Sequence, residues 1–189
     1  MGDDSELIVT DAAAWRAWLD EHEHASDGVW LVLAKKGTQD PTSLTYAEAL
    51  EEALCSGWID GQRRTRDAAT FIQRYTPRRR RSLWSLRNIG IVERLIEERR
   101  MRERGHAEIA AAMSDGRWER AYAGPAAAEA PPDLVAALEA SPAARERFEA
   151  LGSGGRYSVI FPLMTAHTDA TRRRRLEKVV GKLERGEPL

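Results

Sequence analysis

Three short runs with strand character, all before residue 76, constrain the fold of this chain more than any other feature. Val29–Ala34 is apolar, rich in β-formers and followed by Lys35-Lys36-Gly37, as expected of a buried strand. Trp58–Asp60 and Ala68–Tyr75 are two further candidates, and Pro77 closes the second. We therefore predict an α+β fold, with a small antiparallel sheet covered by helices and an all-helical C-terminal tail packed on it.

Helical spacing accounts for most of the remaining sequence. Asp11 is placed to open a helix that carries Trp15 and Trp18 on one face. Thr45 and Glu48 have the spacing of a capping box. Ser82 is expected to cap a third helix. The apolar face of this third helix would consist of Leu86, Ile89, Val92 and Ile96. In the C-terminal tail we predict helices at 133–140, 143–151, 156–167 and 169–185, with a turn at 152–155.

The segment Gly124–Pro132, which reads Gly-Pro-Ala-Ala-Ala-Glu-Ala-Pro-Pro, is the clearest linker in the sequence. It divides the chain into an α+β core at 1–123, the linker at 124–132 and a helical region at 133–189. The helical region is short for independent folding, because small domains bury a small share of their surface. We therefore expect it to pack on the first part.

Composition and cysteine usage favour a cytoplasmic protein. The 189 residues are 42% hydrophobic and 31% charged, which is typical of a folded domain. Cys55 is the single cysteine, so an internal disulfide is excluded. The first six residues are acidic and lack the basic start of a signal peptide. The longest weakly polar run, Tyr157–Thr168, is too short to span a bilayer.

Basic residues are concentrated between Arg63 and Arg87, where nine arginines face a single acid, Asp67. Aromatic residues lie among these arginines, and this mixture is typical of grooves that bind single-stranded nucleic acid. The run Arg78–Arg81 cannot direct all four side chains to one ligand in either strand or helix geometry. A solvated loop is therefore the alternative interpretation of that run.

Six residues form the candidate ligand site. Stacking is assigned to Trp58 and Trp84, anion contacts to Arg63 and Arg78, and directional hydrogen bonds to Asp60 and Asn88. Two interpretations stay open. The residues either line a pocket for a small anionic ligand, or Trp58 lies in the core and Asp60 forms a buried pair with arginine that fixes the turn.

The sequence shows no constellation that predicts catalysis. His22 and His24 diverge on a helix, and no cysteine or third histidine lies close enough in sequence to complete a metal site. Cys55 is expected to be a buried, unreactive thiol. A hydrolase or transferase that uses Asp60 as a general base is kept as an alternative. We predict no cofactor and no metal.

The strings Leu44–Leu50 and Cys55–Arg63, the latter containing Gly-Trp-Ile-Asp-Gly, resemble the YdeI/OmpD-associated family. Further resemblance occurs at Asp115–Trp118, at Pro132–Leu134 and in the tail around Arg172. The resemblance implies a link to stress and to protection from bacteriocins and other antimicrobial peptides. Together these observations predict a non-enzymatic cytoplasmic protein that binds a small anionic ligand, with nucleic-acid association as the alternative.

Overall fold

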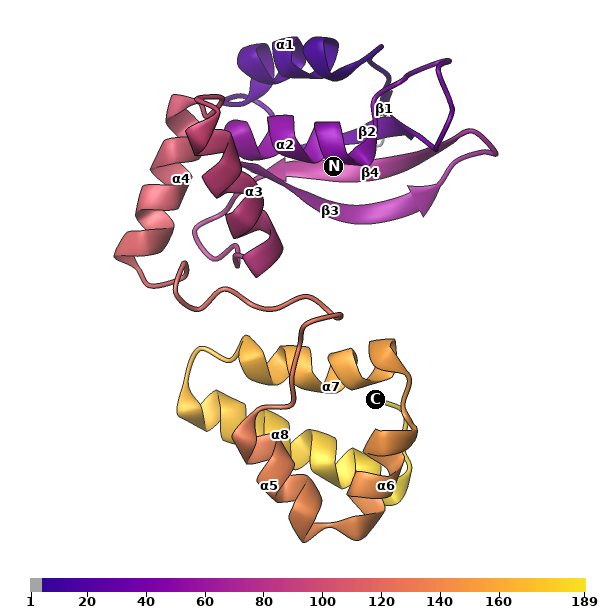
Figure 1. Cartoon of the computed structure of the whole chain (residues 1–189), viewed down its shortest axis with the longest axis vertical. Helices are drawn as coiled ribbons and strands as arrows, with labels where there is room; N and C mark the ends of the chain where they lie inside the picture. The colour runs from indigo at the N-terminus through magenta and orange to yellow at the C-terminus, as the bar shows by residue number, and fades with distance from the viewer. Residues whose placement is uncertain (1–4) are drawn as a thin grey trace. The chain divides into compact units, whose positions relative to one another are not determined.

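The computed structural model describes residues 5–189, which form four strands and eight helices (Figure 1). The strands are β1 (Glu6–Leu7), β2 (Val29–Ala34), β3 (Trp58–Thr65) and β4 (Thr70–Pro77). The helices are α1 (Ala12–His22), α2 (Tyr46–Cys55), α3 (Leu86–Glu97), α4 (Glu103–Ser114), α5 (Pro132–Ala140), α6 (Pro142–Ala150), α7 (Ser153–Met164) and α8 (Asp169–Arg185). The predicted α+β class is confirmed.

The strands form one sheet in the order β1-β2-β4-β3. The three predicted strands pair antiparallel. The central strand is β4, in which Ile72 lies opposite Val32 of β2 on one side and opposite Arg64 of β3 on the other. The sheet is nevertheless mixed, because the short β1, which we did not predict, runs parallel to β2. β3 also continues five residues beyond Asp60, since pairing with β4 resumes at Arg63 after an irregularity.

Helices α1 and α2 cover one face of the sheet, and the main core lies between them (Figure 1). Both predicted N-caps are present: Asp11 accepts from the backbone of Ala14, and Thr45 and Glu48 form the complete capping box. Trp15 and Leu31 are fully buried here. The aromatic spacing predicted for α1 therefore serves core packing.

The third helix departs from the prediction. It begins at Leu86 rather than near Ser82, because the Ser82 hydroxyl accepts instead from the backbone N–H of Arg79 in the preceding loop. Leu86 and Ile96, assigned to the apolar face, are 55% and 40% exposed. The buried face consists of Asn88, Val92 and Leu95. A separate helix, α4, follows after Arg99 adopts a left-handed conformation.

A network of carboxylates and arginines joins α2 to the segment between α3 and α4. The Glu52 carboxylate forms ion pairs with Nη2 of Arg100 at 2.8 Å and with Nη2 of Arg102 at 2.5 Å. Arg102 also donates to the Ser56 hydroxyl and approaches Asp20 at 3.1 Å. The hydrogen bond to Glu52 is the main cause of a raised pKa for Arg100, so this guanidinium stays charged. The network ties three parts of the chain that are distant in sequence.

The chain divides into two compact units. The first comprises the residues up to Ser82 together with Asn88–Glu119, and the second comprises Leu83–Arg87 and Arg120–Leu189. The second unit has its own core, to which α5, α7 and α8 contribute Leu134, Ile160 and Leu183. Its α7 begins at Ser153, so residues 153–155, predicted as part of a turn, form the first turn of this helix. Among the described residues, no helix is long and apolar enough to cross a membrane.

Candidate functional site

Trp58, the proposed stacking platform, is a core residue. Its side chain is fully buried in the cluster below α1 and α2. The indole packs edge-on against Trp15 and Trp18, with centroid separations of 6.4 and 5.9 Å. Its Nε1 has no hydrogen-bond partner within residues 5–189. The burial of Trp58 agrees with one part of the second interpretation, whereas the buried pair of Asp60 with an arginine stays a prediction.

Asp60 and Arg63 lie on β3 but have different neighbours. Asp60 is half-buried and accepts a hydrogen bond of 2.8 Å from the Tyr46 hydroxyl on α2. The guanidinium of Arg63 lies over the Phe71 ring, 3.9 Å from its centroid. Asp60 thus links β3 to the helix that covers it. Its role as a general base stays a prediction.

The other three predicted residues are also buried: Arg78 is 4% exposed, Trp84 2% and Asn88 6%. The backbone N–H of Arg78 donates to the Gly57 carbonyl, which closes the end of the sheet. Trp84 belongs to the second unit, whereas Asn88 belongs to the first. Neither of the two cavities described for this chain is lined by any of the six residues. A ligand pocket at this group stays a prediction, and the burial favours packing.

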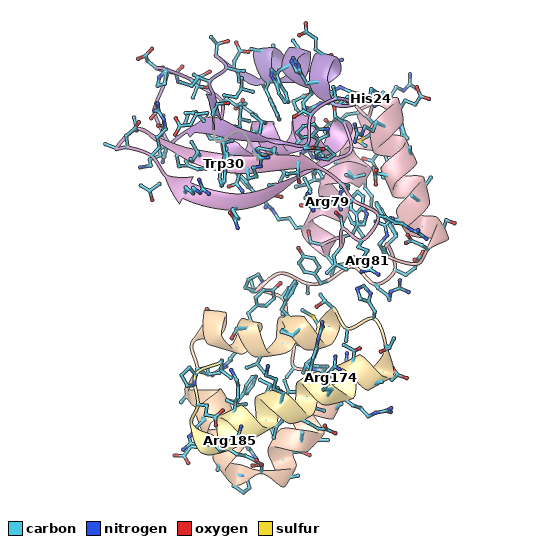
Figure 2. All side chains as sticks on the ribbon, turned by 180° about the vertical axis from the view of Figure 1, so that it is seen from behind. His24, Trp30, Arg79, Arg81, Arg174 and Arg185 are labelled. Atoms are coloured by element: carbon cyan, nitrogen blue, oxygen red, sulfur yellow. The ribbon has the colours of Figure 1, made fainter. Side chains whose placement is uncertain are left out.

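The arginine run separates into one buried and three exposed side chains. Arg78 is buried, while Arg79, Arg80 and Arg81 are exposed. Figure 2 shows Arg79 and Arg81 in the loop before α3. The solvated-loop interpretation therefore holds for those three residues.

Cys55 is buried at the end of α2, as predicted, and burial raises the pKa of its thiol to about 11, with Glu52 adding to the effect. We expect no reaction of the native chain with Ellman's reagent at pH 8, because both access and the thiolate fraction are low. After unfolding in guanidinium chloride, one thiol per chain should react. Rapid labelling of the native protein would contradict this placement.

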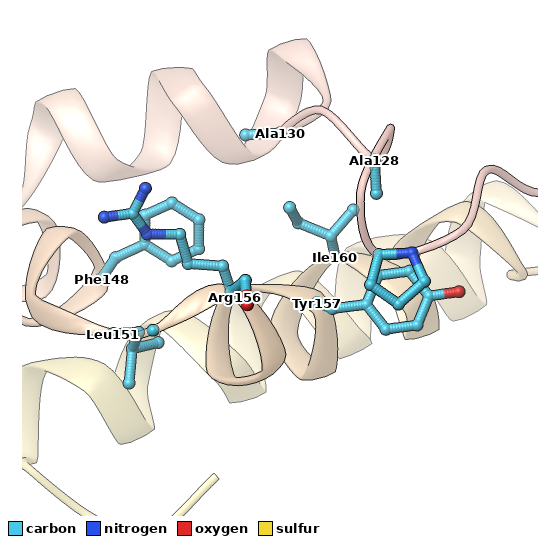
Figure 3. Close-up of a pocket in the computed structure, with 10 residues that line it drawn as sticks. Ala128, Ala130, Phe148, Leu151, Arg156, Tyr157 and Ile160 are labelled. Carbon is cyan, nitrogen blue, oxygen red and sulfur yellow. The ribbon is translucent and has the colours of Figure 1, made fainter. Parts of the chain in front are cut away.

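A cavity lies instead in the second unit, between the linker and helices α6 and α7 (Figure 3). Its volume is about 490 Å³, within the range of small-molecule sites. The lining is mainly apolar and aromatic. It consists of Pro125, Ala128, Ala130, Phe148, Leu151, Gly152, Ser153, Arg156, Tyr157 and Ile160.

Arg156, Tyr157 and Ser153 supply the polar side chains of this cavity. Arg156 is exposed on the first turns of α7, and its Nη2 is held by the Glu149 carbonyl at 2.6 Å. The Tyr157 hydroxyl donates to the Ala123 carbonyl at 3.2 Å. Burial raises the pKa of Tyr157, with the neighbouring Tyr122 contributing, so the phenol stays neutral at physiological pH. The cavity thus has one positive charge and no carboxylate in its lining.

The N-terminus of α7 opens at the same place. Its cap is Gly152, which offers no side chain to the first backbone N–H groups, and Ser153 follows it. A side chain at Gly152 or Gly154 would meet no atom within 4 Å, so packing does not require glycine at either position. Helix N-termini favour negative charge through their unpaired N–H groups and the helix dipole. The uncapped N–H groups of α7 and the charge of Arg156 would both attract an anion.

This cavity was not predicted, because the composition of residues 124–132 indicates only a linker and that of residues 152–155 only a turn. Phe148, Arg156 and Tyr157 come from two helices and were not singled out as a group. The available signal was a glycine-rich helix start followed directly by Arg156-Tyr157. Within the described residues, no group of His, Cys, Asp and Glu side chains could hold a metal ion.

Two family models match the chain. Residues 7–108 match a model described as a domain of unknown function (DUF8412), and residues 127–186 match one described as bacteriocin-protection, YdeI or OmpD-associated. The second match covers only the C-terminal part of the chain. The motifs between Leu44 and Asn88 therefore lie in the region matched by the first model. Comparison with curated proteins and with solved structures gives no match. The chain therefore belongs to the DUF8412 family over more than half its length, and its C-terminal helical region matches the YdeI/OmpD-associated bacteriocin-protection family.

Proposed function

We propose that this chain is a non-enzymatic binding protein that holds a small anionic ligand with an apolar part in the cavity between the linker, α6 and α7. The cavity of about 490 Å³ with Arg156 in its wall is the observation that carries this proposal. The anionic ligand inferred from the sequence is retained, but its site moves from the buried residues around Trp58 to the second unit.

The lining chemistry supports a ligand with two ends. Phe148, Tyr157 and Ile160 provide a surface for an aromatic or aliphatic group, whose burial gains roughly 25 cal/mol per Å². Arg156 provides a fork for a carboxylate, sulfonate or phosphate group. The open start of α7 adds backbone donors beside Ser153. An anion without an apolar part would use only half of these features.

The match of residues 127–186 supports a link to bacteriocin protection, since all the lining residues of the cavity except Pro125 belong to that part of the chain. We propose that residues 124–132 and 133–189 act together as the ligand-binding region, with 1–123 as a separate core. We also propose that the protein acts in the cytoplasm, because its buried free thiol suits a reducing compartment.

The proposal can be tested with 1-anilinonaphthalene-8-sulfonate, a fluorescent anion with an aromatic body. We expect saturable binding to the native chain with enhanced emission. In Arg156→Ala the dissociation constant should rise about tenfold, because a hydrogen bond to a charged group contributes about 1.5 kcal/mol or more. Fluorescence titration measures this, with near-ultraviolet circular dichroism to verify that tertiary packing is unchanged.

Two controls separate the cavity from general charge and hydrophobicity. Arg173 is exposed on α8 in the same unit and does not line the cavity, so Arg173→Ala should bind like wild type. The neutral dye N-phenyl-1-naphthylamine carries the same rings without the sulfonate and should be insensitive to Arg156→Ala. Equal affinities of the Arg156 and Arg173 variants for the anion would contradict the proposal.

A further inference from the structure

A second cavity lies within the second unit, between α7 and α8, and its lining differs from that of the first. Its volume is about 240 Å³, slightly below the usual range of small-molecule sites, so it suits a short ligand. Its apolar side chains come from Pro162, Val179 and Leu189. The remaining lining residues are Ser158, Arg175, Lys178 and Lys182. The lining therefore combines apolar surface with three cations and contains no carboxylate side chain.

The three cations, called here the cation row, lie on one face of α8. Lys178 follows Arg175 by three positions and precedes Lys182 by four, and residues at these spacings are neighbours on a helix surface. A helix rises about 1.5 Å per residue, so the two ends of the row are about 10 Å apart along the axis. Val179 lies between Lys178 and Lys182 in sequence and lines the same cavity. The row thus presents positive charge at both ends of an apolar surface.

Backbone carbonyls hold the two outer cations of this row. Arg175 donates from Nη1 to the Pro162 carbonyl at 2.6 Å. Lys182 donates from Nζ to the Pro188 carbonyl at 2.7 Å. Both acceptors are neutral, so these contacts orient the side chains without cancelling their charges. A guanidinium has five N–H donors, and Arg175 therefore keeps further donors for a ligand.

The middle cation, Lys178, is exposed, and no hydrogen bond or ion pair connects it to any other residue that the structure describes. The pKa of the nearby Glu187 is lowered mainly by its hydrogen bond with Arg185, while Lys182 makes a smaller contribution. Like charges one turn apart on a helix repel one another. An anion bound along the cation row would relieve this repulsion and so stabilise α8.

We propose that this cavity between α7 and α8 binds a small aliphatic dicarboxylate. One carboxylate binds Lys182 and the other binds Arg175 and Lys178. The chain between them packs on Val179, and burial of its methylenes adds to the affinity. Charge complementarity is the argument for two anionic groups, because three cations and no carboxylate side chain line the cavity. The single cation of the first cavity, Arg156, suits a ligand with one anionic end, so the two sites are independent.

Each cation has a different task. Arg175 presents a planar fork, which binds a carboxylate through two parallel N–H groups. Lys178 adds a point charge to the same carboxylate, and Lys182 binds the opposite one. Because carbonyls already hold the outer two side chains, less side-chain freedom is lost when the ligand binds. A monocarboxylate with the same chain would engage only one end of the row.

The test is isothermal titration calorimetry of the full-length chain with suberate, a dicarboxylate with six methylenes, at low salt. We expect saturable binding of one suberate per chain. Lys178→Gln with Lys182→Gln retains polar side chains but removes two charges, and should raise the dissociation constant at least about tenfold. Lys178→Gln alone removes no contact among the described residues, so it should fold normally and raise the dissociation constant about fivefold.

Two further ligands test the carboxylates and the chain separately. Octanoate has the same number of carbons as suberate but one carboxylate, so it should bind at least about tenfold more weakly. Succinate has both carboxylates but four fewer methylenes. Each methylene that enters the cavity changes the dissociation constant by up to about fourfold, so succinate should also bind more weakly than suberate.

The matched control is Arg173→Gln with Arg174→Gln, which removes two exposed charges from the same helix outside the cavity. It should bind suberate like wild type, and so should Arg156→Ala, whose site is the first cavity. The proposal is overturned by the absence of saturable binding, by equal losses in the two double variants, or by octanoate binding as tightly as suberate. Tighter binding of an alternating glutamate–leucine peptide than of suberate would overturn it in favour of a protein partner.

Discussion

Replacing Gly105 by alanine should destabilise the first unit by about 3 kcal/mol, because the contact of α4 with α2 leaves no room for a methyl group. A Cβ at this position would lie 2.3 Å from the carbonyl oxygen of Cys55 and 2.6 Å from the Met101 methyl group. The Met101 side chain can move, but the Cys55 oxygen belongs to the backbone of α2. That oxygen also accepts from the N–H of Arg102, which would be displaced with it.

Urea unfolding followed by tryptophan fluorescence measures this effect, because Trp15, Trp18 and Trp58 all report on the first unit. Gly90→Ala is the control. Gly90 is exposed within α3 and a Cβ there would meet nothing within 4 Å, so this change should stabilise the helix by about 0.5–1 kcal/mol. Two glycine-to-alanine changes in neighbouring helices should thus have opposite signs. A Gly105 variant as stable as wild type would show that α4 does not approach α2 this closely.

The second large effect is expected for Glu52→Gln. The side chains of Glu52 and Arg102 are 10% and 14% exposed, so removing the carboxylate charge leaves a guanidinium poorly solvated. Loss of one partner of such a pair costs about 3–5 kcal/mol. Arg100 loses a partner at the same time, since it donates to the other Glu52 oxygen. We therefore expect a loss of about 3 kcal/mol in the free energy of unfolding, measured by the same urea titration.

Glu98→Gln provides the comparison. Glu98 also pairs with Arg100, and with Arg94, but its side chain is 39% exposed. Exposed pairs contribute about 0.2–1 kcal/mol, so its loss should be small. The ratio of the two effects tests whether burial, rather than the number of ion pairs, determines the stability of the junction between α3 and α4. Similar values for both variants would show that Glu52 is solvated in solution.

Local sequence patterns predicted the elements that depend on local physics. The strand at Val29–Ala34, the cap of α1 at Asp11 and the capping box of α2 are all present. Each depends on residues within a few positions of one another. The start of α3 was wrong because Ser82 had a competing local partner, the N–H of Arg79. β1 was missed because a two-residue strand exists only through pairing with β2.

The candidate sites depended on distant residues, and there the sequence was insufficient. Trp58 and Arg64 lie six positions apart on β3, yet Trp58 faces the core below α1 while Arg64 lies over Trp30 on the opposite face. The alternation of β3 was not predictable beyond Asp60, because the irregularity before Arg63 changes the pairing register. The cavity is likewise lined by residues from elements that are separated in sequence, namely the linker, α6 and α7.

The sequence alone determined the α+β class and the caps of α1 and α2, because these follow from hydrophobic periodicity and short-range hydrogen bonds. Only the tertiary structure decided which aromatic residues face the core, which arginines share a surface and where a cavity opens. Side-chain direction on a sheet reverses with a shift of one residue. Cavities form between elements that are distant in the chain, so short-range spacing carries no record of them.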